Sequence, residues 1–396
     1  MKTLIHNATL VLPERLLENG WLLLEDERIL ALGEQDSCPL LEQNALDAEG
    51  QLLLPGLIDL HCDAIEKLVE PRPGVDFDLE LALREADWRL AGCGITTEFH
   101  AVTLDDHEFG VRSEGFVRDL SLAIRNKADL CVRHRLHARL ELSSQRGYAV
   151  VAELVAQREA DLISLMDHSP GQGQYANVEA YRDYVARTTN RSQAEIDAFI
   201  ALKLARASEI PERLEAAACL VREAGLALAT HDDDTATRVK RWPALGVSMS
   251  EFPTTMEAAQ AAHDLGLIVC MGAPNVLRGK SSGGNLSALS AIQAGVTDAL
   301  SSDYYPGAML AAVFRLVQLE MLSLPEAVKL VTLNPARAVG MDAEYGSLEP
   351  GKLADVIVVG LNQRGLPRVR NLFVGGRACV STHHRSVALP IAAGQN

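Results

Sequence analysis

The feature of this sequence that most constrains its fold is a regular alternation of short apolar segments with helical segments over residues 55–343. This alternation predicts a parallel sheet covered by helices, because two parallel strands need a helical crossover to connect them. Eight segments have strand character, which is the number that closes a (β/α)8 TIM barrel. They contain residues 57–60, 95–99, 136–142, 162–166, 226–230, 247–250, 267–271 and 299–302. An open, doubly wound sheet is the alternative fold.

Both ends of the chain have a different pattern. Residues 2–32, and those from Gly346 onward, are short β-prone segments separated by Gly, Asn and Pro, which is typical of hairpins. We therefore predict an α/β protein in which both termini build one small β-sandwich beside the barrel. The predicted boundaries are 1–54 and 344–396 for the sandwich and 55–343 for the barrel.

Charge and cysteine content limit the partners and the compartment. The chain has 37 basic and 53 acidic residues, and its net charge of −16 opposes binding to nucleic acid or to an anionic membrane. Seven scattered cysteines without a C-x-x-C pair fit a reducing compartment. Apolar runs stay shorter than the ~18 residues of a membrane span. We expect a cytoplasmic homo-oligomer. The polar, helix-prone residues 177–208 are interpreted as a lid or as a dimer contact.

Polar residues recur where the predicted strands end. His61 and Asp63 follow the first strand, and period-two alternation would direct both side chains to one cation. Singly, such residues can equally be salt-bridged or cap a helix. Together, they predict a site for one or two divalent ions such as Zn, Mn, Fe or Ni. The predicted ligands are His61, Asp63, Glu141, His168, His231 and Asp303. Asp303, after the eighth strand, stands where a general base would accept a proton from water.

Basic and Gly-rich loops follow the first and seventh strands. A loop of this kind that leads into a helix can hold phosphate oxygens through backbone N–H groups and cationic side chains. The predicted substrate-binding residues are Lys67, Arg72, Asn275, Arg278 and Lys280. The sequence therefore predicts a small, anionic, phosphorylated substrate.

Several motifs resemble those of the amidohydrolase superfamily: Pro55–His61, Gly94–Thr97 and Asn334–Arg337. Longer stretches are similar to the diphosphatases of the carbon–phosphorus lyase (phosphonate) pathway. These stretches are residues 71–76, 134–137, 164–172, 251–255, 271–275 and 301–306. The resemblance implies a barrel with a β-sandwich, bound divalent metals, and hydrolysis of a phosphoanhydride of a ribosyl methylphosphonate triphosphate with release of pyrophosphate.

The chain departs from that family's pattern at Ala64, His100, Gly173 and Ser282, where other residue types are usual. We therefore expect a retained metal centre with an altered substrate shell, to which Glu98 and His100 add a candidate ligand. Hydrolysis of a C–N bond, as in a deaminase or cyclic amide hydrolase, is the alternative activity. A barrel that has lost catalysis and serves as an assembly subunit is the non-enzymatic alternative.

Overall fold

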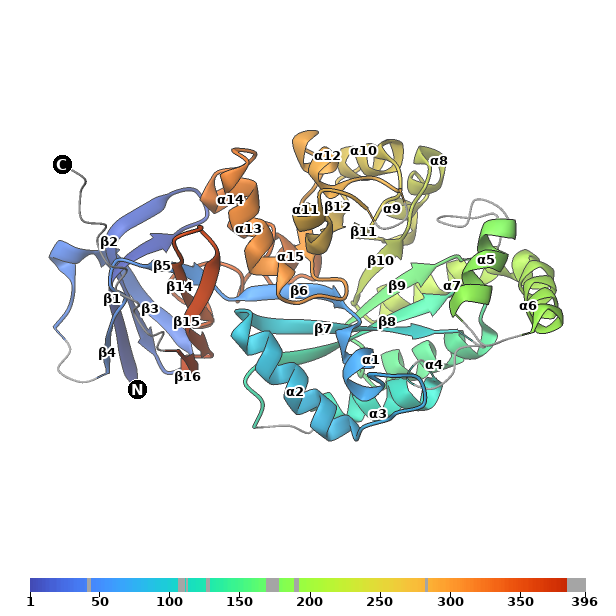
Figure 1. Cartoon of the computed structure of the whole chain (residues 1–396), viewed down its shortest axis with the longest axis horizontal. Coiled ribbons are helices and arrows are strands. Elements are labelled where there is room, and N and C mark those ends of the chain that lie inside the picture. Colours follow the sequence, from blue (N-terminus) through green and yellow to red (C-terminus); the bar gives the residue numbers. More distant parts are fainter. Residues whose placement is uncertain are drawn as a thin grey trace, which may run out of the picture.

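Two eight-stranded sheets organise the chain, and they lie next to each other in Figure 1. The computed structural model describes residues 1–40, 44–105, 111, 113–125, 129–168, 178–188, 192–281 and 284–382. One sheet is a parallel barrel surrounded by helices, and the other is mostly antiparallel. The predicted fold class is therefore confirmed. No helix among these residues has the length and apolar character that a membrane crossing requires.

The barrel strands follow one another around the sheet in chain order, and each pairs in parallel with the next. The strands are β6 (Leu57–Cys62), β7 (Ile95–Leu104), β8 (Arg133–Glu141), β9 (Leu162–Met166), β10 (Ala227–His231), β11 (Met249–Glu251), β12 (Ile268–Gly272) and β13 (Ala299–Ser301). Asp303 connects the last strand to the first, because its N–H donates to His61 O and its C=O accepts from Asp63 N, both at 2.8 Å. The barrel is thus closed next to three predicted site residues.

Helices cover the outside of the barrel. Their bounds are α1 (Ala64–Val69), α2 (Leu79–Gly92), α3 (Glu114–Arg125), α4 (Gln145–Ala156), α5 (Val178–Thr188), α6 (Gln193–Ala205), α7 (Ile210–Glu223), α8 (Ala236–Val239), α9 (Trp242–Leu245), α10 (Met256–Asp264), α11 (Ala273–Arg278), α12 (Ala288–Gln293), α13 (Ala308–Gln318), α14 (Leu324–Lys329) and α15 (Leu333–Ala338). Local sequence explains several ends: Asp78 caps α2 by accepting from two backbone N–H groups. Gly225, which follows the C-cap residue Ala224 of α7, has a φ of 68°.

Alternation along the strands sorts side chains into two layers. On β8, Leu136, Ala138 and Leu140 belong to the apolar core shared with the surrounding helices. The residues between them therefore face the barrel interior. Phe99, Leu162 and other apolar side chains fill the barrel's interior core. The polar side chains discussed below lie nearer the carboxyl-terminal ends of the strands.

The second sheet joins both ends of the chain, as predicted. Its order is β16 (Arg377–Ser381), β15 (Pro367–Val374), β14 (Val356–Leu361), β5 (Leu52–Pro55), β1 (Lys2–Val11), β2 (Leu16–Glu25) and β3 (Arg28–Glu34), and β4 (Ala45–Asp47) also pairs with β1. Its own apolar core combines residues from both ends, such as Leu10 and Val356. Other residues, such as Ile357 and Leu372, belong to the barrel's core. This terminal sheet is therefore packed against the barrel.

Candidate metal centre

Three buried side chains converge inside the barrel: His61 of β6, His137 of β8 and Glu251 of β11. Nδ1 of His61 lies 3.1 Å from Oε1 of Glu251, and Nε2 of His137 lies 3.6 Å from Oε2 of the same carboxylate. Burial lowers the pKa of His137 to about 3 and also lowers the pKa of His61. Both imidazoles are therefore neutral near pH 7, which is the form that ligates metal ions.

A second group adjoins the first. His168 follows β9, and its Nε2 lies 3.3 Å from Oδ2 of Asp232, while Nδ1 of His231 lies 3.1 Å from the same oxygen. Nδ1 of His168 lies 3.2 Å from Oε2 of Glu141. The ring of His231 lies 5.9 Å from that of His168 and 5.4 Å from that of His61, measured between centroids. The two groups therefore form one continuous centre.

Electrostatics in the second group favour charged forms. Although burial opposes charge, hydrogen bonds and charge interactions with Asp232 and Glu141 raise the pKa of His168 to about 9. Burial likewise raises the pKa of Glu141, but the Lys203 ammonium and His168 outweigh it and lower that pKa to about 2. Without a bound ion, His168 is therefore protonated near pH 7 and pairs with Asp232 and Glu141, and a metal ion that bound this imidazole would displace its proton.

Asp303 occupies the junction where the barrel closes. Its backbone is fixed between His61 and Asp63 by the two hydrogen bonds that close the barrel. Burial, and then the nearby negative charge of Asp63, raise the pKa of the Asp303 carboxyl to about 6. A mostly buried carboxylate beside the His61 strand end is suited to accept a proton from a bound water.

Three non-glycine residues at this end of the barrel have left-handed backbone conformations. Asp232, Phe252 and Asp303 follow β10, β11 and β13 with φ values of 57°, 52° and 60°. Such conformations are uncommon for residues with a side chain and cluster at functional sites. The ring of Phe252 packs against His61 at 4.9 Å and His231 at 5.3 Å between centroids, so this backbone positions one wall of the centre.

Two positively charged side chains, those of Lys203 and Arg139, contact residues of the metal centre. Lys203 of α6 has a side chain only 4% exposed, and its Nζ lies 2.8 Å from Oδ2 of Asp105 and 3.9 Å from Oε1 of Glu141. Nη2 of Arg139 donates to Nε2 of His231 at 3.2 Å. The segment 177–208 thus contributes a buried side chain to the centre through α6, although Figure 1 shows α5 and α6 at the end of the molecule opposite the terminal sheet.

Comparison with known proteins identifies the family. The model of the amidohydrolase family matches residues 52–379, which is most of the chain. The chain belongs to the amidohydrolase family. It is 40% identical over 363 residues to the α-D-ribose 1-methylphosphonate 5-triphosphate diphosphatase of Escherichia coli K12, covering 90% of this chain and 94% of that one. It is 28% identical over 342 residues to the imidazolonepropionase of Pseudomonas paraeruginosa, covering 79% and 80%.

Solved structures agree on the amidohydrolase fold. The 5-methylcytosine deaminase from Klebsiella pneumoniae has a TM-score of 0.67 at 16% identity, with 98% of this chain and 100% of that chain covered. The ochratoxinase from A. niger has a TM-score of 0.65 at 16% identity, with 96% of each chain covered. At these identities the similarity concerns the fold alone.

The donor set of this amidohydrolase fits divalent metal ions, which the family typically binds. The His61–His137–Glu251 and His168–His231–Asp232 groups each bring three ligand-type atoms within 4.8 Å of one another. Oε2 of Glu251 is buried and accepts no hydrogen bond from the residues that the structure describes, although it faces an imidazole. Mixed nitrogen and oxygen donors with an unsatisfied buried carboxylate oxygen are what a divalent cation would complete.

The structure groups the predicted ligands differently from the sequence. His61 lies with His137 and Glu251, which were absent from the predicted set, whereas Asp63 is the residue before α1 and lies beside Asp303. Strand alternation does not extend to Asp63, because β6 ends at Cys62. Alternation along β8 could have identified His137, which shares a face with Glu141. Glu251 ends a strand of only three residues and carried no such signal.

The predicted substrate-binding residues lie in segments that follow β6 and β12. Lys67, Arg72, Arg278 and Lys280 are exposed, and Nη1 of Arg278 donates to Tyr304 Oη at 3.4 Å. Asn275 instead joins two helices, because its Oδ1 accepts from Ala288 N at 3.3 Å. The basic residues therefore lie at the surface in two segments, both of which follow the carboxyl-terminal ends of barrel strands.

The four residues that depart from the family pattern lie in different parts of the chain. Ala64 begins α1 beside Asp63, while Gly173 and Ser282 lie outside the described residues. His100 points away from the barrel interior, because its ring stacks on His134 and its Nε2 lies 2.7 Å from Nδ1 of His134. Its neighbour Glu98 forms a buried group with Asp59 and Cys62 in the barrel wall. Neither His100 nor Glu98 joins the two His-containing groups in the part of the chain described.

Proposed function

We propose that this protein is a metal-dependent hydrolase that cleaves a phosphoanhydride of α-D-ribose 1-methylphosphonate 5-triphosphate, or a close relative of it, and releases pyrophosphate. The strongest support is the 40% identity to a diphosphatase of that name over 90% of the chain. The buried ligand groups and the exposed basic residues around them are consistent with this reaction.

One or two divalent ions, drawn from Zn, Mn, Fe and Ni, are the cofactors of this proposal. His61, His137 and Glu251 would hold one ion, and the His168–His231–Asp232 group would hold a second. A divalent ion at such a site lowers the pKa of water and polarises a phosphoryl oxygen. Glu141, which contacts His168, orients that imidazole through Nδ1.

In this proposal the protein's own side chains accept the proton of water and bind the phosphate groups. Asp303 receives the proton of the attacking water on its carboxylate, while Asp63 keeps that carboxyl basic through its nearby charge. Lys67, Arg72, Arg278 and Lys280 attract the phosphate chain of the substrate at the surface. Because arginine forms paired hydrogen bonds to phosphate, Arg72 and Arg278 are expected to orient the chain as well as attract it.

Pyrophosphate release from the triphosphate by metal-loaded protein tests this proposal. Asp303→Asn should lower turnover by about 10²–10⁴-fold with metal content unchanged. Asp264→Asn, at an exposed carboxylate at the end of α10, is the matched control and should leave turnover unchanged. Full activity in Asp303→Asn would reject its role as base, and no pyrophosphate release by the wild type would reject the substrate class.

Hydrolysis of a C–N bond is the second candidate function. It is supported by the 28% identity to imidazolonepropionase over 79% of the chain. Turnover of neutral cyclic amides that pyrophosphate does not inhibit would favour this candidate over the first, because a phosphate-binding site would be competed by pyrophosphate.

We also propose that the protein is a cytoplasmic homo-oligomer that associates through the outer face of α2. Trp88 and Leu81 on this helix are 71% and 56% exposed, and Phe77 just before it is 49% exposed. Clustered exposed apolar side chains are typical of contacts between proteins. Light scattering should therefore report a smaller mass for Trp88→Arg than for the wild type, and equal masses would reject this surface.

A further inference from the structure

A cavity of about 590 Å³ lies at the opposite end of the barrel from the metal centre. It is bounded by the start of β8, by Asp161 before β9, by the end of α3, and by two turns of the terminal sheet. Arg133 begins β8 and Glu141 ends it, so eight residue steps, about 26 Å, separate this cavity from the metal centre. A small molecule bound at the metal centre therefore does not extend into this cavity.

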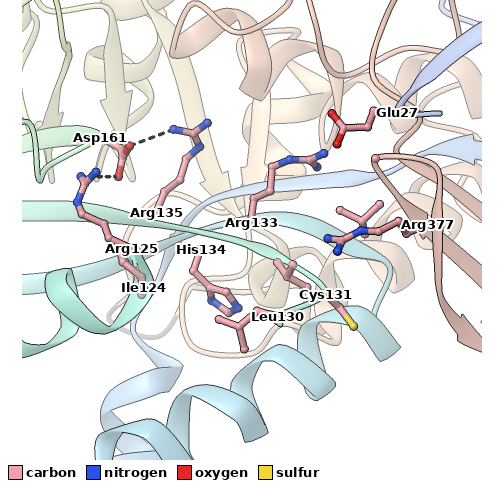
Figure 2. Close-up of a pocket in the computed structure, with 13 residues that line it drawn as sticks. Glu27, Ile124, Arg125, Leu130, Cys131, Arg133, His134, Arg135, Asp161 and Arg377 are labelled. Carbon is pink, nitrogen blue, oxygen red and sulfur yellow. Dashed lines mark hydrogen bonds and ion pairs between the residues drawn. The ribbon is translucent and has the colours of Figure 1, made fainter. Parts of the chain in front are cut away.

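Four arginines line the cavity: Arg125, Arg133, Arg135 and Arg377. Figure 2 shows Arg125 and Arg135 reaching Asp161 from two sides, with nitrogen–oxygen distances of 3.8 and 3.0 Å. Two guanidinium groups thus share one carboxylate, which leaves positive charge uncompensated.

The terminal sheet supplies the other arginine. Arg377 begins β16 and is exposed, and it has no ion-pair partner within 4.0 Å among the residues that the structure describes. Arg133 pairs with Asp355, which lies outside the lining. The acidic side chains nearest these arginines are Asp161, Asp355 and Glu27, while Asp87 contacts His134 and two backbone N–H groups of the lining. The distinguishing feature of the cavity is therefore Arg377, with which no described carboxylate pairs.

The backbone keeps this end of the cavity open. Gly375, between β15 and β16, has a φ of 52°, and a Cβ at this residue would lie 3.2 Å from Nη2 of Arg133. Oδ1 of Asp355 accepts from Gly375 N at 2.8 Å, so the carboxylate that pairs with Arg133 also fixes the turn. The barrel and the terminal sheet are therefore joined in a way that leaves the Arg133 guanidinium uncovered by a side chain at residue 375.

We propose that this cavity is a second anion-binding site, which takes a small molecule carrying a phosphate group. Guanidinium groups donate paired hydrogen bonds that match the oxygens of phosphate. Arg133 of β8 and Arg377 of β16 come from different elements at the same part of the cavity, because the Arg133 guanidinium lies against Gly375, two residues before Arg377. Figure 2 shows Arg125 and Arg135 farther along the cavity, around Asp161, so Arg133 and Arg377 are the pair that would hold the phosphate group. The cavity volume falls within the range of about 300–1,000 Å³ that is usual for small-molecule sites. This inference does not depend on the reaction proposed for the metal centre.

Calorimetric titration of the metal-loaded protein with inorganic phosphate tests the site. The test variant is Arg377→Glu, and the matched control is Arg368→Glu, an exposed arginine on the adjacent strand β15 outside the cavity. We expect phosphate to bind Arg377→Glu at least tenfold more weakly than wild type or Arg368→Glu, with turnover the same in all three. Thermal unfolding confirms that each variant is folded.

Two further arms separate the sources of the signal. His231→Ala, which removes a ligand of the metal centre, should keep the binding that depends on Arg377. Ribose 5-phosphate titrated in place of phosphate shows whether the cavity prefers the free ion or the phosphate end of a metabolite, and Arg377 dependence with either supports the site. Equal affinity in Arg377→Glu and wild type, loss of all phosphate binding in His231→Ala, or no binding by the wild type would each overturn it.

Discussion

Replacing Lys203 with methionine should destabilise the protein strongly, although Lys203 lies on a helix outside the barrel. Its ammonium is buried between Asp105, at 2.8 Å, and Glu141, at 3.9 Å. Methionine keeps the apolar stem but removes the charge, so both carboxylates lose a buried counter-charge. Removing one partner of a buried ion pair costs about 3–5 kcal/mol. We expect about 3 kcal/mol, near the lower limit, because Asp105 is 11% exposed and keeps some contact with water.

Chemical unfolding of four proteins measures this coupling: wild type, Lys203→Met, Asp105→Leu and the double variant. Replacing both partners by apolar groups leaves no unpaired charge at the Asp105 site, so the double variant should lose less free energy of unfolding than the sum of the single variants. We expect a difference of about 1–3 kcal/mol. Lys240→Met, at an exposed lysine with no ion pair in the described structure, should stay within about 0.5 kcal/mol of wild type.

Additive losses, within about 0.5 kcal/mol, would refute the reasoning, because they would mean that Lys203 and Asp105 do not interact in the folded protein. A loss in Lys203→Met as small as in Lys240→Met would refute it equally, since it would show that the ammonium is not buried.

Three further outcomes are expected. Treatment with a chelator should lower the melting temperature and abolish turnover, with both restored by Zn or Mn, because a bound ion stabilises only the folded state; an unchanged melting temperature would contradict the metal centre. Phe99→Ala should cost about 3–5 kcal/mol in chemical unfolding, because Phe99 is 1% exposed inside the barrel, and a loss below 1 kcal/mol would contradict that packing. Asp87→Asn should cost about 1.5–3 kcal/mol at pH 7. Although burial alone would raise it, hydrogen bonds from His134, Val132 N and Cys131 N lower the pKa of Asp87, so this stability is present above the ordinary pKa of aspartate and is lost as pH falls through the lowered value. The difference between Asp87→Asn and wild type should therefore shrink in unfolding measured at pH 3, and a constant difference would contradict it.

The barrel could be predicted because its signals are local. The spacing of apolar residues within a short segment predicts whether that segment forms a strand or a helix. Turn residues such as Gly225 predict helix ends from the neighbouring residues alone. Residues at strand ends could be selected for the same reason, since parallel strands place their carboxyl ends at one face. His61, His168 and His231 were found in this way, and the structure brings all three together.

Contacts between distant segments could not be predicted in the same way. His100 is next to Phe99, which fills the barrel interior, so strand alternation places His100 on the other face, where its ring stacks on His134. Glu251 and His61 are 190 residues apart, and only barrel closure brings them within 3.1 Å. Because a shift of one residue moves a side chain to the other face of a sheet, the two register irregularities between β6 and β7 affect which residues of these strands face the barrel interior.

The sequence by itself determined the order of strands and helices, the β character of both ends, and the polar strand ends that hold the chemistry, because each depends on residues close together in the chain. Tertiary structure alone decided which imidazole meets which carboxylate, that Lys203 reaches Glu141, and that Arg377 faces Arg133 across a cavity. Those pairings depend on strand register and on the packing of whole elements, which no short segment specifies.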